Sequence, residues 1–108
     1  MNPTEEFEKI RQTWPDAKLR TEGGNSAVYL PGFQFESGGV SVTMDLLLYP
    51  YPHGSYVTRL FFRKQLTKGP NWGAHFVCGE SWWAPSWKDV RADQPWISML
   101  ANHLKAVA

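Results

Sequence analysis

The segment from Val40 to Leu48 constrains the fold most, because apolar and polar side chains alternate along it. The apolar members of this alternation are Val40, Val42, Met44, Leu46 and Leu48. A period of two residues predicts a β-strand with one buried face. Leu47 breaks the polar series, so we expect the far end of this strand to be buried on both faces.

A second alternating segment follows a rigid connection. Residues Tyr49 to Gly54 contain two prolines, which fix φ, and a glycine, which permits a reversal. Tyr56 to Arg63 then alternates again and predicts an antiparallel partner for Val40–Leu48. Two earlier segments, 17–22 and Ala27–Phe35, also predict strands, with a bulge or edge position at Pro31-Gly32. Together these segments predict a meander of three or four strands.

Helical patterns lie at the two ends of the chain. Thr4 to Trp14 predicts a first helix, with Thr4 as its N-cap. The last helix is predicted after Asp93 or Gln94 as N-cap, with Pro95 in its first turn. Its apolar stripe consists of Trp96, Met99, Leu100, His103, Leu104 and Val107. We therefore expect an α+β fold in which an antiparallel meander is flanked by an N-terminal and a C-terminal helix.

Length and charge narrow the classes of protein. A chain of 108 residues supports a single domain, 1–108. Eleven basic against ten acidic residues give a net charge of +1, which offers no electrostatic case for nucleic acid. No apolar run approaches the roughly 20 residues that span a bilayer, and the charged N-terminus does not resemble a signal peptide. The single cysteine favours a reducing, cytoplasmic setting, and the scattered histidines predict neither a metal site nor a cofactor.

The stretch Gly69–Trp87 contains the residues that are the best candidates for taking part in a reaction. It holds the only cysteine, Cys78, and four of the six tryptophans. We expect an irregular loop that presents Cys78 on a rigid scaffold, because a thiol is a strong nucleophile and catalytic groups often lie on such loops. The alternative is a buried, inert cysteine, which Phe76 and Val77 beside it favour.

Other polar residues of this stretch have two possible roles each. Asn71 could donate a side-chain hydrogen bond to an oxyanion, an interaction of about 2.7–4 kcal/mol, or it could be a turn residue. His75 invites a cysteine–histidine hydrolase, but no orienting acid accompanies it, so we expect a structural histidine. Glu80 could orient an incoming amine or could be a solvated charge. At least two of the four tryptophans of this stretch are expected to pin the loop to the core; the four are Trp72, Trp82, Trp83 and Trp87.

Four matches, in one order, resemble the ubiquitin-conjugating enzymes. LLLYPYPHGSYVTRLFF is similar to the strand, Tyr-Pro turn and next strand of that family. Gly69-Pro70-Asn71 resembles its His-Pro-Asn motif, Cys78 follows where the catalytic cysteine stands, and Trp83-Ala84-Pro85 resembles its Trp-Ser-Pro. The chain departs from the family in its shorter spacings around Cys78 and in Gly79, where the family has leucine. It also has one helix after the cysteine, whereas the common eukaryotic members have three.

A shortened core of this kind resembles the prokaryotic members, which accompany a ubiquitin-like protein, an activating enzyme and often a metal-dependent isopeptidase, commonly in phage defence. The resemblance implies that Cys78 accepts the C-terminal glycine of a ubiquitin-like protein from an activating enzyme and passes it to a protein amine. It implies an oxyanion role for Asn71 and docking of the activating enzyme on the first helix and early strand turn. Two alternatives remain open: a non-catalytic adaptor of the same fold, and a small aromatic-rich ligand-binding module with a structural cysteine.

Overall fold

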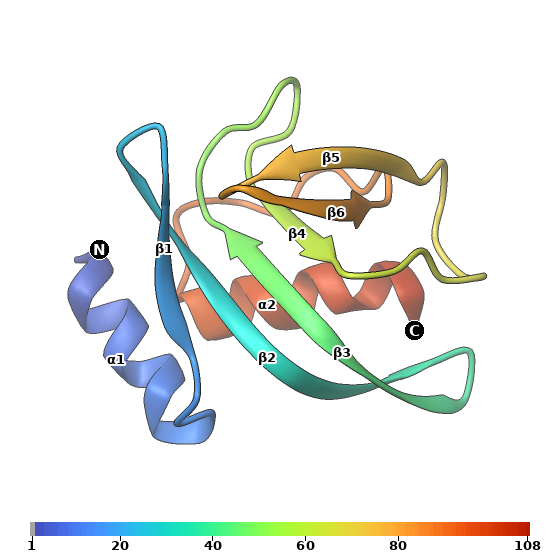
Figure 1. The fold of residues 1–108 in the computed structure, drawn as a ribbon, viewed down its shortest axis with the longest axis horizontal. Coiled ribbons are helices and arrows are strands. Elements are labelled where there is room, and N and C mark those ends of the chain that lie inside the picture. Colours follow the sequence, from blue (N-terminus) through green and yellow to red (C-terminus); the bar gives the residue numbers. More distant parts are fainter. Residues whose placement is uncertain (1) are drawn as a thin grey trace.

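One antiparallel sheet of six strands, in the order β1-β2-β3-β4-β6-β5, dominates the computed structural model, which describes residues 2–108 (Figure 1). Helix α1 precedes the sheet, and helix α2 and a short 3-10 turn, η1, follow it. The elements are α1 (Pro3–Thr13), β1 (Lys18–Glu22), β2 (Asn25–Ser37), β3 (Val40–Tyr49), β4 (Arg59–Phe62), β5 (Gly73–Val77), β6 (Glu80–Ala84), α2 (Trp96–Leu104) and η1 (Lys105–Val107). The predicted α+β class is confirmed, whereas the predicted number of strands, three or four, is wrong.

Strands β1 to β4 form the predicted meander, in which each strand pairs antiparallel with the next. Strand β3 pairs with β4 antiparallel, as expected, with Leu47 opposite Phe61. Strand β4 is shorter than predicted, because the chain before it makes a tight turn in which His53 and Tyr56 bridge each other. The register of β2 against β3 shifts between Leu30 and Phe33, which confirms the bulge expected at Pro31-Gly32.

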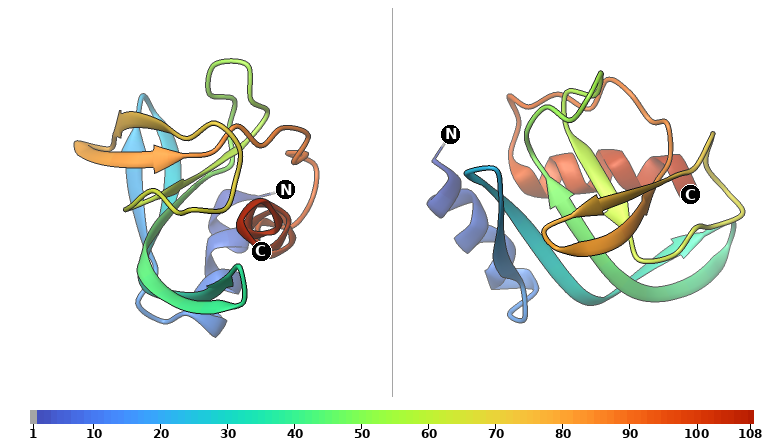
Figure 2. Two further views of the ribbon diagram at one scale, coloured as in Figure 1. Left: turned by 90° about the vertical axis from the view of Figure 1, so that its right-hand side faces the viewer. Right: turned by 45° about the horizontal axis from the view of Figure 1, so that its top comes forward.

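Both faces of the central strands are buried, as Leu47 predicted, and each face has its own core. Alternate residues of a strand point to opposite faces. On one face α2 lies in the concavity of the sheet (Figure 2). The first core includes Val28, Leu30, Leu46, Leu48, Leu60, Phe62, Met99 and Leu100. The second core consists of Ala27, Leu47, Tyr49, Phe61, Val77, Trp82 and Ala84.

The second core is closed by a β-hairpin, β5–β6, where the sequence predicted an irregular loop. Cys78 and Gly79 are the two residues of its turn, with φ of +53° and +77°. Positive φ at both positions is typical of the type I′ turn, which suits the twist of a two-residue hairpin. The prediction of an irregular loop is wrong for residues 73–84. The hairpin forms because β6 alternates, with Trp82 and Ala84 buried and Ser81 exposed.

Side chains, more than strand pairing, attach this hairpin to the sheet. Strand β6 pairs with β4 only through Phe62 and Trp83. The indole of Trp82 is 1% exposed and donates its Nε1–H to the carbonyl oxygen of Val77 at 3.2 Å. The guanidinium of Arg63 lies 4.0 Å from the Trp82 ring and donates to Glu80 at 2.9 Å. Burial of Trp82 is therefore the main anchor of the hairpin.

The N-cap of each helix differs from the prediction. Asn2, rather than Thr4, caps α1, and its Oδ1 accepts the backbone N–H of Thr4 at 2.9 Å. At α2 the N-cap is Pro95, which makes no side-chain cap. The predicted caps of α2 have other partners: the Asp93 carboxylate accepts from Arg91, and the side chain of Gln94 bonds Asn102 and the Arg91 carbonyl.

The carboxylate of Glu6, from α1, supplies the missing cap of α2. Glu6 is 4% exposed, and its Oε1 accepts the backbone N–H of Trp96 at 2.9 Å. This hydrogen bond is the main reason why the pKa of Glu6 lies below its ordinary value, and Lys9, 3.2 Å from Oε2, adds to the effect. A negative charge at a helix N-terminus is stabilised by the helix dipole and by free N–H groups. One side chain therefore fixes α2 against α1.

A second buried polar contact joins α2 to the segment before β4. His103 is 3% exposed, and its Nε2 lies 2.9 Å from Oγ1 of Thr58. Since the Thr58 hydroxyl donates its proton to the Val90 carbonyl at 2.8 Å, its oxygen accepts from a neutral His103 ring. Burial, with a smaller contribution from the charge of Arg59, lowers the pKa of His103 to about 4.

We predict that Glu6→Ala lowers the free energy of unfolding at pH 7 by about 2–3 kcal/mol, because a buried N–H and the N-terminus of α2 lose their charged partner. Glu8→Ala is the matched control, since Glu8 forms an exposed ion pair with Arg11 at 3.0 Å on the same helix. Its loss should cost less than about 0.5 kcal/mol. Urea unfolding measures both, and equal losses would contradict the capping role of Glu6.

We also predict that the free energy of unfolding decreases as the pH is lowered, because of His103. Its pKa rises on unfolding from about 4 to the ordinary 6.5, so the unfolded chain takes up the proton first. The contribution is complete above pH 6.5 and is lost as the pH falls towards 4, by about 3 kcal/mol. Urea unfolding of the wild type and of His103→Gln across this range isolates the effect. A wild-type curve that runs parallel to the His103→Gln curve would contradict it.

Candidate functional site

Cys78 occupies the first position of the β5–β6 turn, at the tip of the hairpin. Its side chain is half-buried against the second core, and its backbone N–H donates to Oε1 of Glu22 at 3.2 Å. Asparagine and glycine are the residues favoured in this left-handed conformation. A cysteine there is not explained by the needs of the turn, and non-glycine residues held at positive φ gather at functional sites.

Charged residues from two other strands surround the thiol. Burial is the first cause that raises the pKa of Cys78 above its ordinary value, and the carboxylate of Glu22 is the second. Glu80 adds to this increase, whereas Arg20 opposes it. The group is therefore a thiol at neutral pH, and it should react more slowly than a free cysteine, because the thiolate is the nucleophile.

Glu22 and Glu80 also place negative charge near Cys78. Glu22 is the last residue of β1, and Glu80 is the first residue of β6, directly after the turn. Arg63 neutralises part of the Glu80 charge, whereas Glu22 forms no ion pair within residues 2–108. The two carboxylates favour the approach of a cation such as an alkylammonium group, and the charge of Arg20 opposes it.

Asn71, the other residue singled out as catalytic, lies at the opposite end of β5. It is exposed in the connection between β4 and β5, with φ of +45°, and its carbonyl accepts from Oγ of Ser86 at 3.2 Å. The chain from Asn71 to Cys78 runs through extended β5 and covers about 20 Å at roughly 3.3 Å per residue. The structure therefore does not bring Asn71 and Cys78 together.

The fold instead brings the two proline-containing motifs side by side. The backbone N–H of Ser86, directly after Trp83-Ala84-Pro85, donates to the carbonyl of Pro70 at 2.7 Å. With the bond from Ser86 to Asn71, this contact closes the base of the hairpin, away from Cys78. Gly69-Pro70-Asn71 and Trp83-Ala84-Pro85 thus have a structural role here as neighbours of one another.

A cluster of basic side chains, which the sequence did not reveal, lies on the second face of the sheet. The rings of His53 and His75 lie 5.4 Å apart at 84°, and both pack on Phe61. Arg59, on the same face of β4 as Phe61, donates from Nη1 to Nδ1 of His53 at 3.4 Å. The sequence pattern that could have revealed this cluster is the strand alternation, which puts Arg59 on the same side of β4 as Phe61.

Most of the tryptophans pin the chain to the two cores, as expected. Trp82 belongs to the second core, and Trp72 and Trp87 pack against the first. The indole N–H of Trp72 donates to the Lys68 carbonyl at 2.8 Å, and that of Trp87 to the Asn102 carbonyl at 3.1 Å. Trp83 is only half-buried and faces outward beside exposed Phe76.

Within residues 2–108, no three histidine, cysteine or acidic side chains gather as metal ligands. Neither helix in this range combines the length and apolar character that a membrane span requires. Comparisons of the chain with protein-family models, with curated proteins and with solved structures found no match.

We predict that the neighbouring charges set the rate at which iodoacetamide alkylates Cys78. Glu22→Gln removes a charge but keeps an oxygen acceptor, so the pKa of the thiol should fall and alkylation at pH 7.5 should accelerate about two- to fivefold. Arg20→Met should slow the reaction by a similar factor. Mass spectrometry follows the reaction. Glu36→Gln is the control, because Glu36 lies near the C-terminal end of β2, away from Glu22 and Arg20. Equal rates in Glu22→Gln and Arg20→Met would contradict this electrostatic assignment.

Proposed function

We propose that this chain carries a ubiquitin-like protein as a thioester on Cys78 and transfers it to an amine. The observation that carries the proposal is the place of Cys78: a half-exposed thiol on a hairpin turn, between the carboxylates of Glu22 and Glu80. A two-residue turn at the end of a hairpin can be approached by a bulky partner. The unfavourable backbone conformation of Cys78 is consistent with a residue retained for its thiol.

The first step is a thioester exchange. The sulfur of Cys78 attacks the carbonyl carbon of a thioester between the ubiquitin-like protein and the activating enzyme. The bond to the departing thiol breaks, and that thiol takes up the proton released by Cys78. One thioester is formed and one is consumed, so the step needs neither an oxidant nor a cofactor at this site.

The second step is attack by an amine. The acceptor approaches as an ammonium ion, which the carboxylates of Glu22 and Glu80 attract towards the sulfur. Once the amine has lost a proton to a carboxylate or to water, its nitrogen bonds the carbonyl carbon and the C–S bond breaks. Cys78 leaves as a thiolate and is reprotonated. An amide and a free thiol result.

The raised pKa of Cys78 is compatible with carrying a thioester. No histidine within residues 2–108 forms a hydrogen bond with the Cys78 sulfur, so the cysteine–histidine pair of a hydrolase is not formed here. The acyl donor and the amine acceptor both come from outside the chain. A site of this kind holds an acyl group and waits for a partner, whereas a hydrolase needs its base in place.

The resemblance to ubiquitin-conjugating enzymes supports the same function. An N-terminal helix, an antiparallel sheet, a Tyr-Pro turn, a cysteine and a closing helix follow one another in the order of that family. The proposal includes a ubiquitin-like protein, an activating enzyme and a protein amine as partners, in a bacterial conjugation or defence system. Asn71 has no part in the chemistry proposed here, because β5 separates it from Cys78.

A non-catalytic adaptor of the same fold is the second candidate. The raised pKa of Cys78 and the distance of Asn71 favour it, since both reduce the catalytic machinery to one weakly ionised thiol. Such an adaptor would bind a ubiquitin-like partner without forming a thioester.

The test uses ubiquitin activated as a C-terminal thioester of mercaptoethanesulfonate, which needs no activating enzyme. Wild-type chain should form an adduct that reducing agent cleaves, and free lysine should discharge it. Glu22→Gln and Glu80→Gln should slow discharge by about threefold or more, because the ammonium loses an attracting charge. Gel electrophoresis and intact mass measure loading and discharge.

Cys78→Asn is the control, because asparagine suits the left-handed turn and should leave the hairpin folded. An adduct in Cys78→Asn, or a native Cys78 that neither loads nor alkylates while the urea-unfolded chain does, would exclude the thioester carrier. Retained binding of ubiquitin in that case would support the adaptor.

A further inference from the structure

Arg59 is a buried cation without an acidic partner. Its side chain lies on the second face of the sheet, and the residue is 6% exposed. Its Nε is buried with no hydrogen-bond partner, and no ion pair involves it within residues 2–108. Burying a guanidinium without a counter-charge is unfavourable by several kcal/mol. Its retention in this place calls for a compensating interaction.

The aromatic surroundings of Arg59 supply only part of that compensation. Its guanidinium carbon lies 3.9 Å from the centroid of the Tyr56 ring, a cation–π contact. A second cation, Nζ of Lys88, lies 5.7 Å from the same ring. Like charges gather at Tyr56 instead of neutralising one another. The carboxylate of Glu22 acts on His53 from nearby but forms no ion pair with either cation within residues 2–108.

Two imidazole rings add hydrogen-bond donors to this positive region. His53 and His75 are both half-buried and contact each other edge to face. The pKa of each is lowered, first by burial and then by the charge of Arg59, so both rings are neutral at pH 7.5. A neutral imidazole still carries one N–H donor.

We propose that Arg59, His53 and His75 form a binding site for a carboxylate group. The guanidinium offers a planar pair of donors that matches the two oxygens of a carboxylate, and the imidazoles offer further N–H groups. None of its three residues forms a hydrogen bond with Cys78, whereas Glu22, which accepts from the backbone N–H of Cys78, also acts electrostatically on His53.

Charge selects the class of ligand. With both histidines neutral, the buried site has one positive charge, that of Arg59, which a carboxylate monoanion balances. A phosphate dianion would leave an excess negative charge in a partly dehydrated place. A metal cation would meet the repulsion of Arg59, although two histidines alone could suggest one.

The experiment is an NMR titration of the histidine Cε1–H signals with sodium acetate at pH 7.5 and constant ionic strength. Acetate should shift the signals of His53 and His75 along a saturating curve, and neutral acetamide should not. Arg59→Lys keeps the charge but loses the planar fork, and it should weaken acetate binding about tenfold or more. Lys64→Met removes an exposed cation just beyond β4 and is the matched control, with unchanged binding.

If Arg59→Lys does not fold, His75→Phe replaces it, because phenylalanine keeps the ring contacts but has no N–H donor; it should also weaken binding. Equal responses to acetate and acetamide in the wild type would overturn the site, as would tighter binding of phosphate than of acetate. The source of the carboxylate follows from N-acetylglycylglycine and its C-terminal amide. Tighter binding of the free acid than of acetate identifies a peptide C-terminus, and equal binding identifies a small free carboxylate.

Discussion

The hydrogen bond from Trp96 to Glu6 joins two helices whose residues lie 90 positions apart, and the rest of the first core depends on it. With its N-terminus held by Glu6, α2 places Met99 and Leu100 against the apolar face of β2 to β4. The carboxylate can be buried because the N–H of Trp96, the helix dipole and Lys9 together replace its lost hydration. The contact therefore positions α2 more than it adds surface burial.

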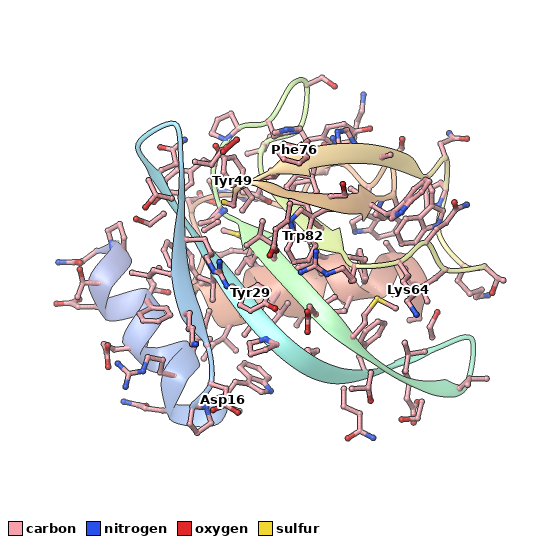
Figure 3. All side chains as sticks on the ribbon, in the orientation of Figure 1. Asp16, Tyr29, Tyr49, Lys64, Phe76 and Trp82 are labelled. Carbon is pink, nitrogen blue, oxygen red and sulfur yellow. The ribbon has the colours of Figure 1, made fainter. Side chains whose placement is uncertain are left out.

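The two-sided burial of β3 and β4 explains the remaining architecture. A strand covered on both faces needs a second layer on the face away from α2. In this chain the layer is a short hairpin filled with large rings, and Tyr29 and Trp82 meet edge to face at 6.1 Å. Figure 3 labels Tyr49 and Trp82, which belong to this second core, and Phe76 of β5, which is exposed.

Local patterns in the sequence predicted the elements well where one period dominates. The alternation of Val40–Leu48 and the stripe of the last helix led to the correct strand, its partner and α2. The helix cap could not be predicted, because it comes from Glu6 and not from the neighbouring Asp93 or Gln94. The hairpin was missed because Cys78-Gly79 does not look like Asn-Gly, although a two-residue spacing with glycine between alternating segments was present.

The candidate site was predicted in part. Cys78 is half-buried at a turn, and its choice as the candidate nucleophile needed only the sequence. Glu22 and Arg20 come from the opposite edge strand and reach Cys78 only because the sheet curves, which no local pattern reveals. Asn71 was chosen for its spacing to Cys78 in a loop, and that spacing becomes a distance of strand length once residues 73–77 are extended.

The single residue pair that links β6 to β4 has a consequence for the native ensemble. Amides of β2 and β3 are held by a long ladder and should exchange with deuterium only on global unfolding, whereas those of β5 and β6 can open as a local cooperative unit. The main free-energy cost of that opening is the transfer of the buried indole of Trp82 into water. Full exposure of the half-buried Cys78 is thus an equilibrium property, set by how often this sub-global unit detaches while the rest of the domain stays intact.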